Sequence, residues 1–528
     1  MSFKKKVAAA AVLSALATAS LLAGAQTIRI ANQGDALSLD PHSLNESLQL
    51  SVDANIYEPL VGRNKDLSLA PLLATSWKMT SPTVWRFELR KGVKFQDGTP
   101  FTADDVVFSI ARGQGDGSDM KATLSDIKAV RKIDDYTVDV ETTAPQPILA
   151  DALTTFGIMS KKWCEENKAE KPVDRRKGIE NAASFKANGT GPFRVRERQP
   201  NVRTVFERNA TYWGKIEGNA QQVVFTPIAN PATRVAALLS GEVDVMEPVP
   251  LQDIARINAS ANAHVIVGPE LRTIFLGMDQ RRDELQYSNV KGKNPFKDVR
   301  VRKAFYQAID IEGIKRTVMR GASRPTGLLA GPGVNGWTEA QDKRLPYDPE
   351  AAKKLLAEAG YPSGFEVSMN CPNDRYVNDA QICQAVAANL AKVGVKINLV
   401  AETKGTYFPK ILRRDTSFYM LGWTPTTYDA HNVLNSLTAC PDDKTGAGQF
   451  NLGAYCNPKL DALTKQIQSE TDKAKRDDLI KQAFALHAED VGTLPLHQQT
   501  LAWGVSKKVS LTQLADNYMP FKWMSIKP

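Results

Sequence analysis

The pattern of hydrophobic and polar positions along the chain predicts a mixture of strands and helices. Apolar residues alternate with polar ones at 84–89 (VWRFEL) and occur as short apolar runs at 223–228 (VVFTPI), which is typical of strands. Residues 102–112 instead follow helical spacing, and Thr102 with Asp105 forms a capping-box pattern at the start of that helix. Further strands are expected at 26–31, 91–98 (a strand and a turn), 136–141 and 494–505.

The segment 365–400 predicts a strand–helix–strand unit, with its helix at 379–392. Such a unit implies two parallel strands joined by a right-handed crossover. Residues 160–190 are polar and are expected to be irregular. Other helices are predicted at 231–240, 300–309 and 349–359, and two more within 457–488. The whole pattern indicates an α/β fold.

The first 25 residues predict export. Lys4, Lys5 and Lys6 precede an apolar run at 7–22, which ends in the small residues 23–25 (AGA). This order is typical of a secretory signal peptide that is cleaved after Ala25. No Cys follows the run, so we expect no lipid anchor, and no later stretch reaches the ~18 apolar residues of a membrane span. The mature protein is expected to be exported and soluble.

The length and charge of the chain limit the possible folds and partners. The 503 residues that follow the predicted signal peptide are too many for one core, so two or three domains are expected. The formal charge of +9 falls to +6 without the three leader lysines, and the remaining basic residues are interleaved with acids. A nucleic-acid-binding protein would more often cluster its basic residues. We therefore expect no nucleic-acid partner.

Four of the five cysteines form two locally spaced pairs, Cys371 with Cys383 and Cys440 with Cys456. In an oxidising compartment we expect each pair to form a disulfide. A loop of roughly 15 residues closed in this way contributes about 3 kcal/mol in the chain-entropy model. Cys164 is left over and is expected to be a buried spare thiol, with a catalytic thiol as the alternative. No cysteine or histidine set has the spacing of a metal site.

Catalytic motifs are missing from the sequence. It contains no G-x-S-x-G, H-E-x-x-H or Walker A pattern. Residues 331–336 (GPGVNG) formally match G-x-G-x-x-G, but no convincing strand precedes them and they contain Pro, so we interpret them as a loop. An exported protein of this size without such motifs favours binding over catalysis, and no cofactor is expected.

Nine segments in a fixed order carry a resemblance to a known family. Over nearly its whole length the chain resembles the extracytoplasmic solute-binding proteins of peptide-type ABC importers (solute-binding family 5). The stretch 87–105 (FELRKGVKFQDGTPFTADD) is the most specific match. The other segments are 39–42, 57–61, 70–77, 189–193, 209–214, 241–244, 301–305 and 347–352.

The resemblance implies a two-lobed periplasmic-binding-protein fold of the large class, with the ligand cleft between the lobes. Its domains would be 26–56 and 188–276 for the first lobe, 57–187 for an extra subdomain, 277–499 for the second lobe and 500–528 for the return to the first lobe. A monomer that passes its ligand to the membrane subunits of an ABC permease is also implied.

The resemblance also points to ligand-binding residues in the second lobe. Peptide-binding members carry a Trp and, three residues later, an Asp that pairs with the ligand's α-ammonium. Here Trp423 matches, but Thr426 holds the Asp position, and Asp429 follows later. A neutral hydroxyl forms a weaker bond to an ammonium than a carboxylate does. Either Asp429 takes the ammonium through a shifted loop, or the ligand has no free α-ammonium at that point.

A second match is the segment 372–376 (PNDRY). By resemblance, Arg375 would hold the carboxylate of the ligand, which its planar guanidinium can bind through two parallel hydrogen bonds. Tyr376 would lie beside it in the site. The alternative is that Arg375 is an ordinary surface residue.

Three functions remain open at this point. The first is a periplasmic receptor for a small solute, most simply a short peptide, that serves an ABC permease. The second is the same scaffold with a non-peptide solute such as an opine, an oligosaccharide or a metal chelate, which the loss of the Asp after Trp423 keeps open. The third is a secreted hydrolase, which the missing nucleophile motifs disfavour.

Overall fold

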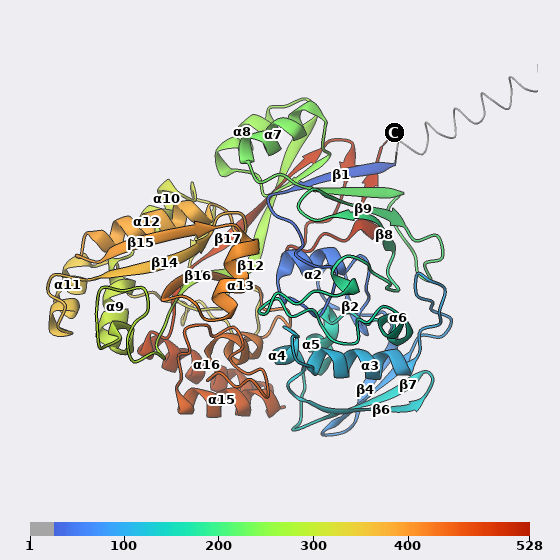
Figure 1. The fold of residues 1–528 in the computed structure, drawn as a ribbon, viewed down its shortest axis with the longest axis horizontal. Coiled ribbons are helices and arrows are strands. Elements are labelled where there is room, and N and C mark those ends of the chain that lie inside the picture. Colours follow the sequence, from blue (N-terminus) through green and yellow to red (C-terminus); the bar gives the residue numbers. More distant parts are fainter. Residues whose placement is uncertain (1–25, 528) are drawn as a thin grey trace, which may run out of the picture.

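The computed structural model describes residues 26–527, so the predicted signal peptide at 1–25 lies outside the described residues. Figure 1 shows two bodies side by side, one yellow to orange and one blue to green. They are joined by the strands β12 (Ala263–Met278) and β17 (Leu494–Ser506). We call the body that contains β1 (Thr27–Asn32) the first lobe, and the body that contains β14 (Glu366–Pro372) the second lobe.

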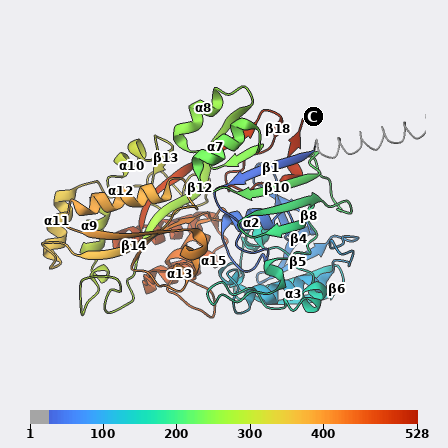
Figure 2. The ribbon, with the colours of Figure 1, turned by 45° about the horizontal axis from the view of Figure 1, so that its top comes forward.

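One eleven-stranded sheet runs through both lobes, as Figure 2 shows from a tilted view. Its order is β15-β14-β16-β12-β17-β11-β1-β10-β9-β8, and β13 also pairs with β17. The bounds not yet given are β15 Lys396–Glu402, β16 Phe418–Trp423, β11 Val245–Glu247, β10 Gln222–Pro227, β9 Arg203–Arg208, β8 Phe193–Gln199 and β13 Ser323–Pro325.

The ladder between β12 and β17 changes at the junction of the lobes. Residues 263–269 of β12 pair with 506–500 of β17, and pairing resumes at Thr273 with Gln498. The register is broken between Pro269 and Thr273. This irregularity bends the strand locally and turns side chains out of the regular pleat. Glu270 and Arg272 in this segment line the space between the lobes, where the site described below is found, whereas Leu271 packs in a hydrophobic core.

The first lobe carries a separate four-stranded sheet, β4-β5-β7-β6. Its strands are β4 Ala74–Ser81, β5 Val84–Leu89, β7 Thr137–Thr142 and β6 Ile127–Asp134. The helix α3 (Ala103–Gln114) packs on it through Val106 and Ile110, which belong to the same buried cluster as Phe87 and Val138. The predicted capping box is present, because the Thr102 backbone N–H donates to Asp105 at 2.9 Å.

Helices cover the sheet of the second lobe. The predicted strand–helix–strand unit is confirmed, since β14 pairs in parallel with β15 and α12 (Asp379–Ala391) connects them. The other predicted helices are also present. They are α7 Pro231–Ser240 in the first lobe and α9 Val299–Ala308, α11 Pro349–Glu358, α15 Pro458–Ser469 and α16 Lys473–Asp490 in the second.

Two sequence expectations are wrong. Residues 91–98 form turns with one isolated bridge, between Lys94 and Pro100, instead of a strand. The stretch 160–190 is not irregular throughout, because it contains α6 (Lys161–Glu166). Ser160 caps this short helix by accepting a hydrogen bond from the backbone N–H of Trp163, and Cys164 anchors it in the core of the first lobe.

The cysteines pair as the sequence predicts. Disulfides join Cys371 to Cys383 and Cys440 to Cys456, and Cys164 is free and buried. Burial raises the pKa of the Cys164 thiol to about 12, so it stays protonated at neutral pH. Such a thiol is a packing residue.

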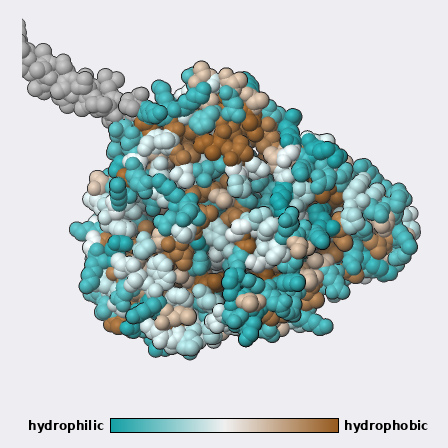
Figure 3. Space-filling view, turned by 180° about the vertical axis from the view of Figure 1, so that it is seen from behind, coloured by the Kyte–Doolittle hydropathy of each residue, from teal (hydrophilic) through white to brown (hydrophobic). Residues whose placement is uncertain are grey.

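Within residues 26–527, no helix combines the length and the apolar character that crossing a bilayer requires. Figure 3 shows that the face opposite to Figure 1 is mostly polar, with one broader apolar area near its upper edge.

Candidate functional site

Two neighbouring cavities lie where the two lobes meet. The first is lined by Glu46 and Trp423, and the second by Glu247 and Glu270. Both are lined by Arg272 of β12 and by Arg375 and Tyr376 of the loop that follows β14. The first lobe contributes Glu46, which precedes α2 (Ser47–Asp53), and Glu247 at the end of β11. Residues from both lobes therefore surround one interlobe site.

Trp423, predicted as a ligand-binding residue, ends β16 and lines the first cavity. Its ring lies 4.9 Å, centroid to centroid, from that of Phe450, and its Nε1 donates to Asn432 Oδ1 at 2.8 Å. The indole is 6% exposed. Because Asn432 already accepts the indole N–H, the ring can serve as a fixed apolar wall of the site.

Tyr376 links the Trp423 strand to the cations of the site. Its hydroxyl accepts a hydrogen bond from the Gly422 backbone N–H at 2.9 Å. A Cβ at Gly422 would lie only 2.7 Å from the Tyr376 ring and 3.0 Å from the Arg272 side chain. The absence of a side chain at 422 therefore allows both residues to approach β16.

Two guanidinium groups lie against the Tyr376 ring. The guanidinium carbons of Arg375 and Arg272 are 4.9 Å and 5.7 Å from the ring centroid. Arg272 Nε donates to Glu270 at 2.7 Å, whereas the buried Arg272 Nη2 has no hydrogen-bond partner among the described residues. Tyr376 thus positions two cations side by side.

Sequence analysis missed Arg272. The charged pair Glu270 and Arg272 within the strand-forming stretch 263–278 was a usable signal, because a buried charge in a strand requires a partner.

Arg375 is not an ordinary surface residue, because its side chain is 8% exposed and forms an ion pair across the lobes. Glu46 of the first lobe lies 2.5 Å from Arg375 Nε and 3.1 Å from Lys404 Nζ, both in the second lobe. Burial alone would raise the pKa of Glu46, but these two cations lower it to about 2. Glu46 therefore stays ionised and ties the lobes together in this closed arrangement.

Asp429 is not available to a ligand. Both of its oxygens bind Arg476, at 2.6 and 2.7 Å, and one also caps α14 (Ala430–Val433) by accepting from the His431 backbone N–H. Its carboxylate lines neither interlobe cavity. Arg476, 47 residues later, already neutralises Asp429, which argues against the sequence alternative in which Asp429 replaces the missing carboxylate.

Thr426 lies on the wall between two spaces. It is half-buried and lines the first cavity together with Thr424, and both also line a third, larger space. This third space reaches Arg63, Tyr428 and Trp523. The loop after Trp423 thus separates the charged part of the site from a larger aromatic one.

The second cavity contains carboxylates that the sequence analysis did not single out. Glu247 accepts hydrogen bonds from the Asn32 side chain at 2.9 Å and from the Asn517 side chain at 2.6 Å. Burial, reinforced by the nearby charge of Glu270, raises the pKa of Glu247 to about 7. Only the tertiary structure brings Glu247 next to the hinge residues Glu270 and Arg272.

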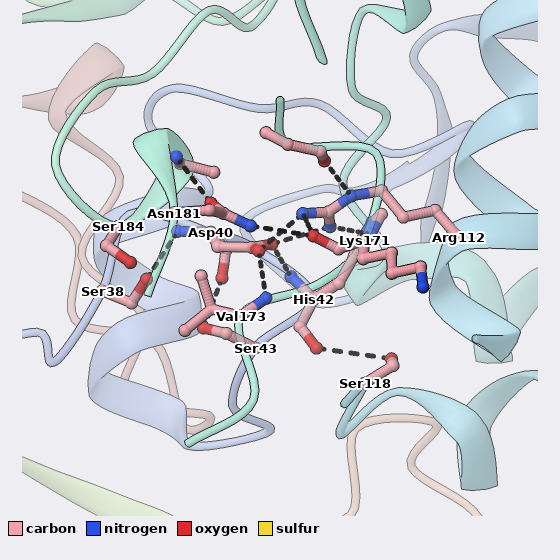
Figure 4. A network of polar contacts seen from close by, with 12 residues as sticks. Ser38, Asp40, His42, Ser43, Arg112, Ser118, Lys171, Val173, Asn181 and Ser184 are labelled. Carbon is pink, nitrogen blue, oxygen red and sulfur yellow. Dashed lines mark hydrogen bonds and ion pairs between the residues drawn. The ribbon is translucent and has the colours of Figure 1, made fainter. Parts of the chain in front are cut away.

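Another charged cluster lies inside the first lobe, away from these cavities. Figure 4 shows Arg112 bound to both oxygens of Asp40, at 2.8 and 2.6 Å, with His42 beside them. The remaining Arg112 donors reach the carbonyl oxygens of Ala169 and Lys171. Asp40 also accepts from the Val173 backbone N–H. Because every strong partner is internal, this cluster has a structural role.

Residues 26–527 contain no group of three or more His, Cys, Asp or Glu residues arranged to hold a metal ion. Nothing in the geometry of the described residues therefore points to a metal site.

The comparisons with known proteins agree with this architecture. Residues 68–445 match the model of "Bacterial extracellular solute-binding proteins, family 5 Middle". The dipeptide-binding protein of Escherichia coli K12 is 28% identical over 83% of this chain and 82% of its own length. The glutathione-binding protein GsiB of Pectobacterium atrosepticum is 25% identical over 97% of this chain and 96% of its own.

Solved structures match over almost the full chain. The periplasmic binding protein DppA of Helicobacter pylori, in complex with the peptide STSA, superposes with a TM-score of 0.84 at 24% identity, over 95% of this chain and 98% of its own. The agropinic acid complex of AgaA from A. tumefaciens R10 also gives 0.84, at 23% identity, over 95% of this chain and 99% of its own. The two-lobed α/β fold predicted from the sequence is confirmed. The chain belongs to the bacterial extracellular solute-binding proteins of family 5.

Proposed function

We propose that this protein is a periplasmic receptor that traps a short peptide between its lobes and delivers it to the membrane subunits of an ABC permease. The observation that carries the proposal is the interlobe site, where Trp423 forms an apolar wall and Arg272 and Arg375 present two buried cations. Buried guanidinium groups bind carboxylates strongly and with defined geometry. A peptide supplies such a carboxylate together with side chains that can fill apolar space.

In this proposal Arg375 and Arg272 hold the ligand's carboxylate, while Trp423 and Tyr376 form the wall beside it. Thr426 contributes a neutral contact at the border with the third space, which gives room for longer ligands or larger side chains. The similarity to a dipeptide-binding and a glutathione-binding protein supports a peptide ligand. The same relatives, which are named as binding proteins, support a role in binding without catalysis.

Loss of the family's Asp at position 426 favours one second candidate, a non-peptide solute. An opine would need no primary α-ammonium and could still offer carboxylates to Arg272 and Arg375. The agropinic acid complex of AgaA supports the idea that this fold can bind such a compound.

Ligand identification tests the proposal directly. The protein should be purified from the periplasm of its host, and the bound compound should be released by denaturation and identified by mass spectrometry. We expect a short peptide, whose re-addition to stripped protein makes the particle contract in small-angle scattering. An opine or a sugar would overturn the peptide assignment, and steady consumption of the ligand by the pure protein would overturn the receptor function.

A further inference from the structure

The missing aspartate at 426 raises the question of which carboxylate could meet the amino end of a peptide. Among the described residues, four carboxylates line the interlobe cavities, namely Glu46, Glu247, Glu270 and Asp374. They differ in which donors and cations already bind their oxygens. Their contacts therefore decide which one is available. Asp374 accepts the Lys404 backbone N–H at 2.6 Å, and the charges of Lys404 and Arg375 already act on it.

Glu46 and Glu270 are already matched by cations. Glu46 is bound by Arg375 and Lys404, and it also accepts the backbone N–H groups of Leu48 and Gln49. Glu270 is paired with Arg272 at 2.7 Å. A ligand ammonium at either position would have to compete with a buried cation.

Glu247 is different, because its two oxygens receive only neutral amide donors, from Asn32 and Asn517. Within residues 26–527, no cationic group lies within ion-pair distance of it. Its side chain is nevertheless buried and lines the second cavity. An ionised carboxylate in such a place is costly unless a cation arrives.

A second observation points independently to a charged ligand. Arg272, 2% exposed, lines the same cavity, and its Nη2 has no partner among the described residues. A buried unpaired guanidinium N–H requires an acceptor. One cavity therefore offers a carboxylate without a cation on the first-lobe side and a guanidinium donor without an acceptor on the hinge.

We propose that Glu247 binds the α-ammonium of the ligand, in place of the carboxylate that peptide-binding relatives carry after the Trp, while Arg272 and Arg375 bind its carboxylate. This inference rests on the proposed function, because it assumes a peptide. It goes further in moving the ammonium site from the second lobe to the end of β11 in the first lobe. The ligand would then connect the lobes through its own two charges.

The predicted selectivity follows from the burial of Glu247. A free amine would supply a cation and hydrogen-bond donors, whereas an N-acetyl group would leave the carboxylate unpaired and would need extra space. The raised pKa of Glu247 is consistent with this arrangement, since an arriving ammonium would favour ionisation. The charged groups that act on Glu247 are Glu270, Arg272, Arg375 and, from α7, Arg234.

The test uses the full-length mature protein, stripped of ligand, with alanyl-alanine and N-acetyl-alanyl-alanine as probes in titration calorimetry. For wild type we expect the free-amine peptide to bind at least about tenfold more tightly, as the loss of a charge-assisted bond implies. Glu247→Gln should weaken alanyl-alanine binding by a similar factor and leave the acetylated peptide nearly unchanged. If Glu247→Gln retains the wild-type preference, the inference is wrong.

Glu58→Gln is the matched control. Glu58 is also a buried first-lobe carboxylate with neutral donors (Thr190, Tyr212 and Trp213), but it lines none of the three spaces described here. Its replacement should leave the preference intact. A preference lost equally in both variants would contradict the assignment to Glu247.

A measurement on wild type covers the case in which Glu247→Gln does not fold. Binding of alanyl-alanine should release a proton near pH 7, and its affinity should rise about tenfold between pH 5.5 and 7 as Glu247 ionises. The same titration in two buffers of different ionisation heat measures that proton. No proton release and no preference for the free amine would overturn the inference while leaving a peptide receptor in place. Failure of free-amine peptides to bind at all would overturn the proposed function with it.

Discussion

Two buried carboxylate–guanidinium pairs in this protein differ in what surrounds them. Asp40 and Arg112 have fully buried side chains inside the first lobe, and backbone groups complete their hydrogen bonds. Glu46 and Arg375 are almost equally buried, at 4% and 8%, but they lie on opposite lobes. The first pair can reach water only if the lobe unfolds, whereas the second can reach water when the lobes separate.

The same chemistry therefore serves two purposes. An internal pair fixes the fold, because removing one partner leaves a charge that cannot be hydrated. An interlobe pair biases the equilibrium between closed and open forms, because each partner regains its hydration on opening. The predictions below test this difference, from the largest expected effect to the smallest.

Arg112→Met should destabilise the protein most. It leaves Asp40 buried without its cation, which typically costs about 3–5 kcal/mol in the free energy of unfolding. Urea unfolding followed by circular dichroism measures the loss. The control is Arg131→Met, which removes an exposed partner of Glu141 and should change stability by less than about 1 kcal/mol. Equal losses in the two variants would contradict the structural role of the internal pair.

Glu247→Gln should change how stability depends on pH. The pKa of Glu247 is raised from 4.5 to about 7 in the folded protein, so protonation of this side chain stabilises the fold. That stabilisation is fully present below pH 4.5. That contribution is lost as pH rises through 7, and the shift corresponds to about 3 kcal/mol in all. Glutamine does not ionise, so the variant should gain stability relative to wild type between pH 5 and 8. A pH-independent difference in unfolding free energy would rule this out.

Arg375→Ala should weaken binding of the natural ligand. Loss of a charged hydrogen bond is worth about 1.5–3 kcal/mol, or roughly tenfold to more than a hundredfold in affinity. Trp423→Ala should also weaken binding, through loss of the apolar wall, and both variants should keep the wild-type fold by circular dichroism. Titration calorimetry measures the affinities. If both variants bind like wild type, the ligand site lies elsewhere.

Glu46→Gln should affect the lobe equilibrium more than the fold. Arg375 and Lys404 can be rehydrated when the lobes open, so we expect the free energy of unfolding to fall by only about 1 kcal/mol or less. Small-angle scattering of ligand-free protein should show a larger radius of gyration than for wild type. A loss of stability as large as that in Arg112→Met, with unchanged scattering, would remove the distinction between the two pairs.

Thr426→Ala should have the smallest effect. Its hydroxyl can form only a neutral contact, so ligand affinity should fall by less than about threefold, well below the effect of Arg375→Ala. Calorimetry with the natural ligand decides this. A loss as large as that of Arg375→Ala would place the polar anchor on the loop after Trp423 and would argue against Glu247.

Much of the local structure was predictable from the sequence. Alternation placed β5, a short apolar run placed β10, and the Asn230–Pro231 start with Gly241 beyond the end bounded α7. These signals are local, since strand alternation and helix capping depend on residues only a few positions apart. Local spacing likewise predicted the two disulfides. The segment 91–98 failed because a short polar alternation cannot by itself distinguish a strand from turns.

The candidate site was predictable only in part. Resemblance to the family indicated Trp423, Arg375 and Tyr376, and all three line the interlobe cavities, although their roles toward a ligand stay predictions. The sequence could not show which carboxylates are free to bind a ligand, because their ion pairs are formed with residues far away in the chain. Asp429 is neutralised by Arg476, and Glu46 is bound by Lys404, 358 residues away.

The sequence by itself therefore determined the elements, the disulfide pairs and the family. The tertiary structure decided which charges are already paired and which face the cleft. The physical reason is that the energy of a buried charge depends on the partners and the hydration that folding leaves to it, and both come from residues far apart in the chain. Glu247 became visible as a site residue, and as a neighbour of Arg272 in one cavity, only in the folded sheet.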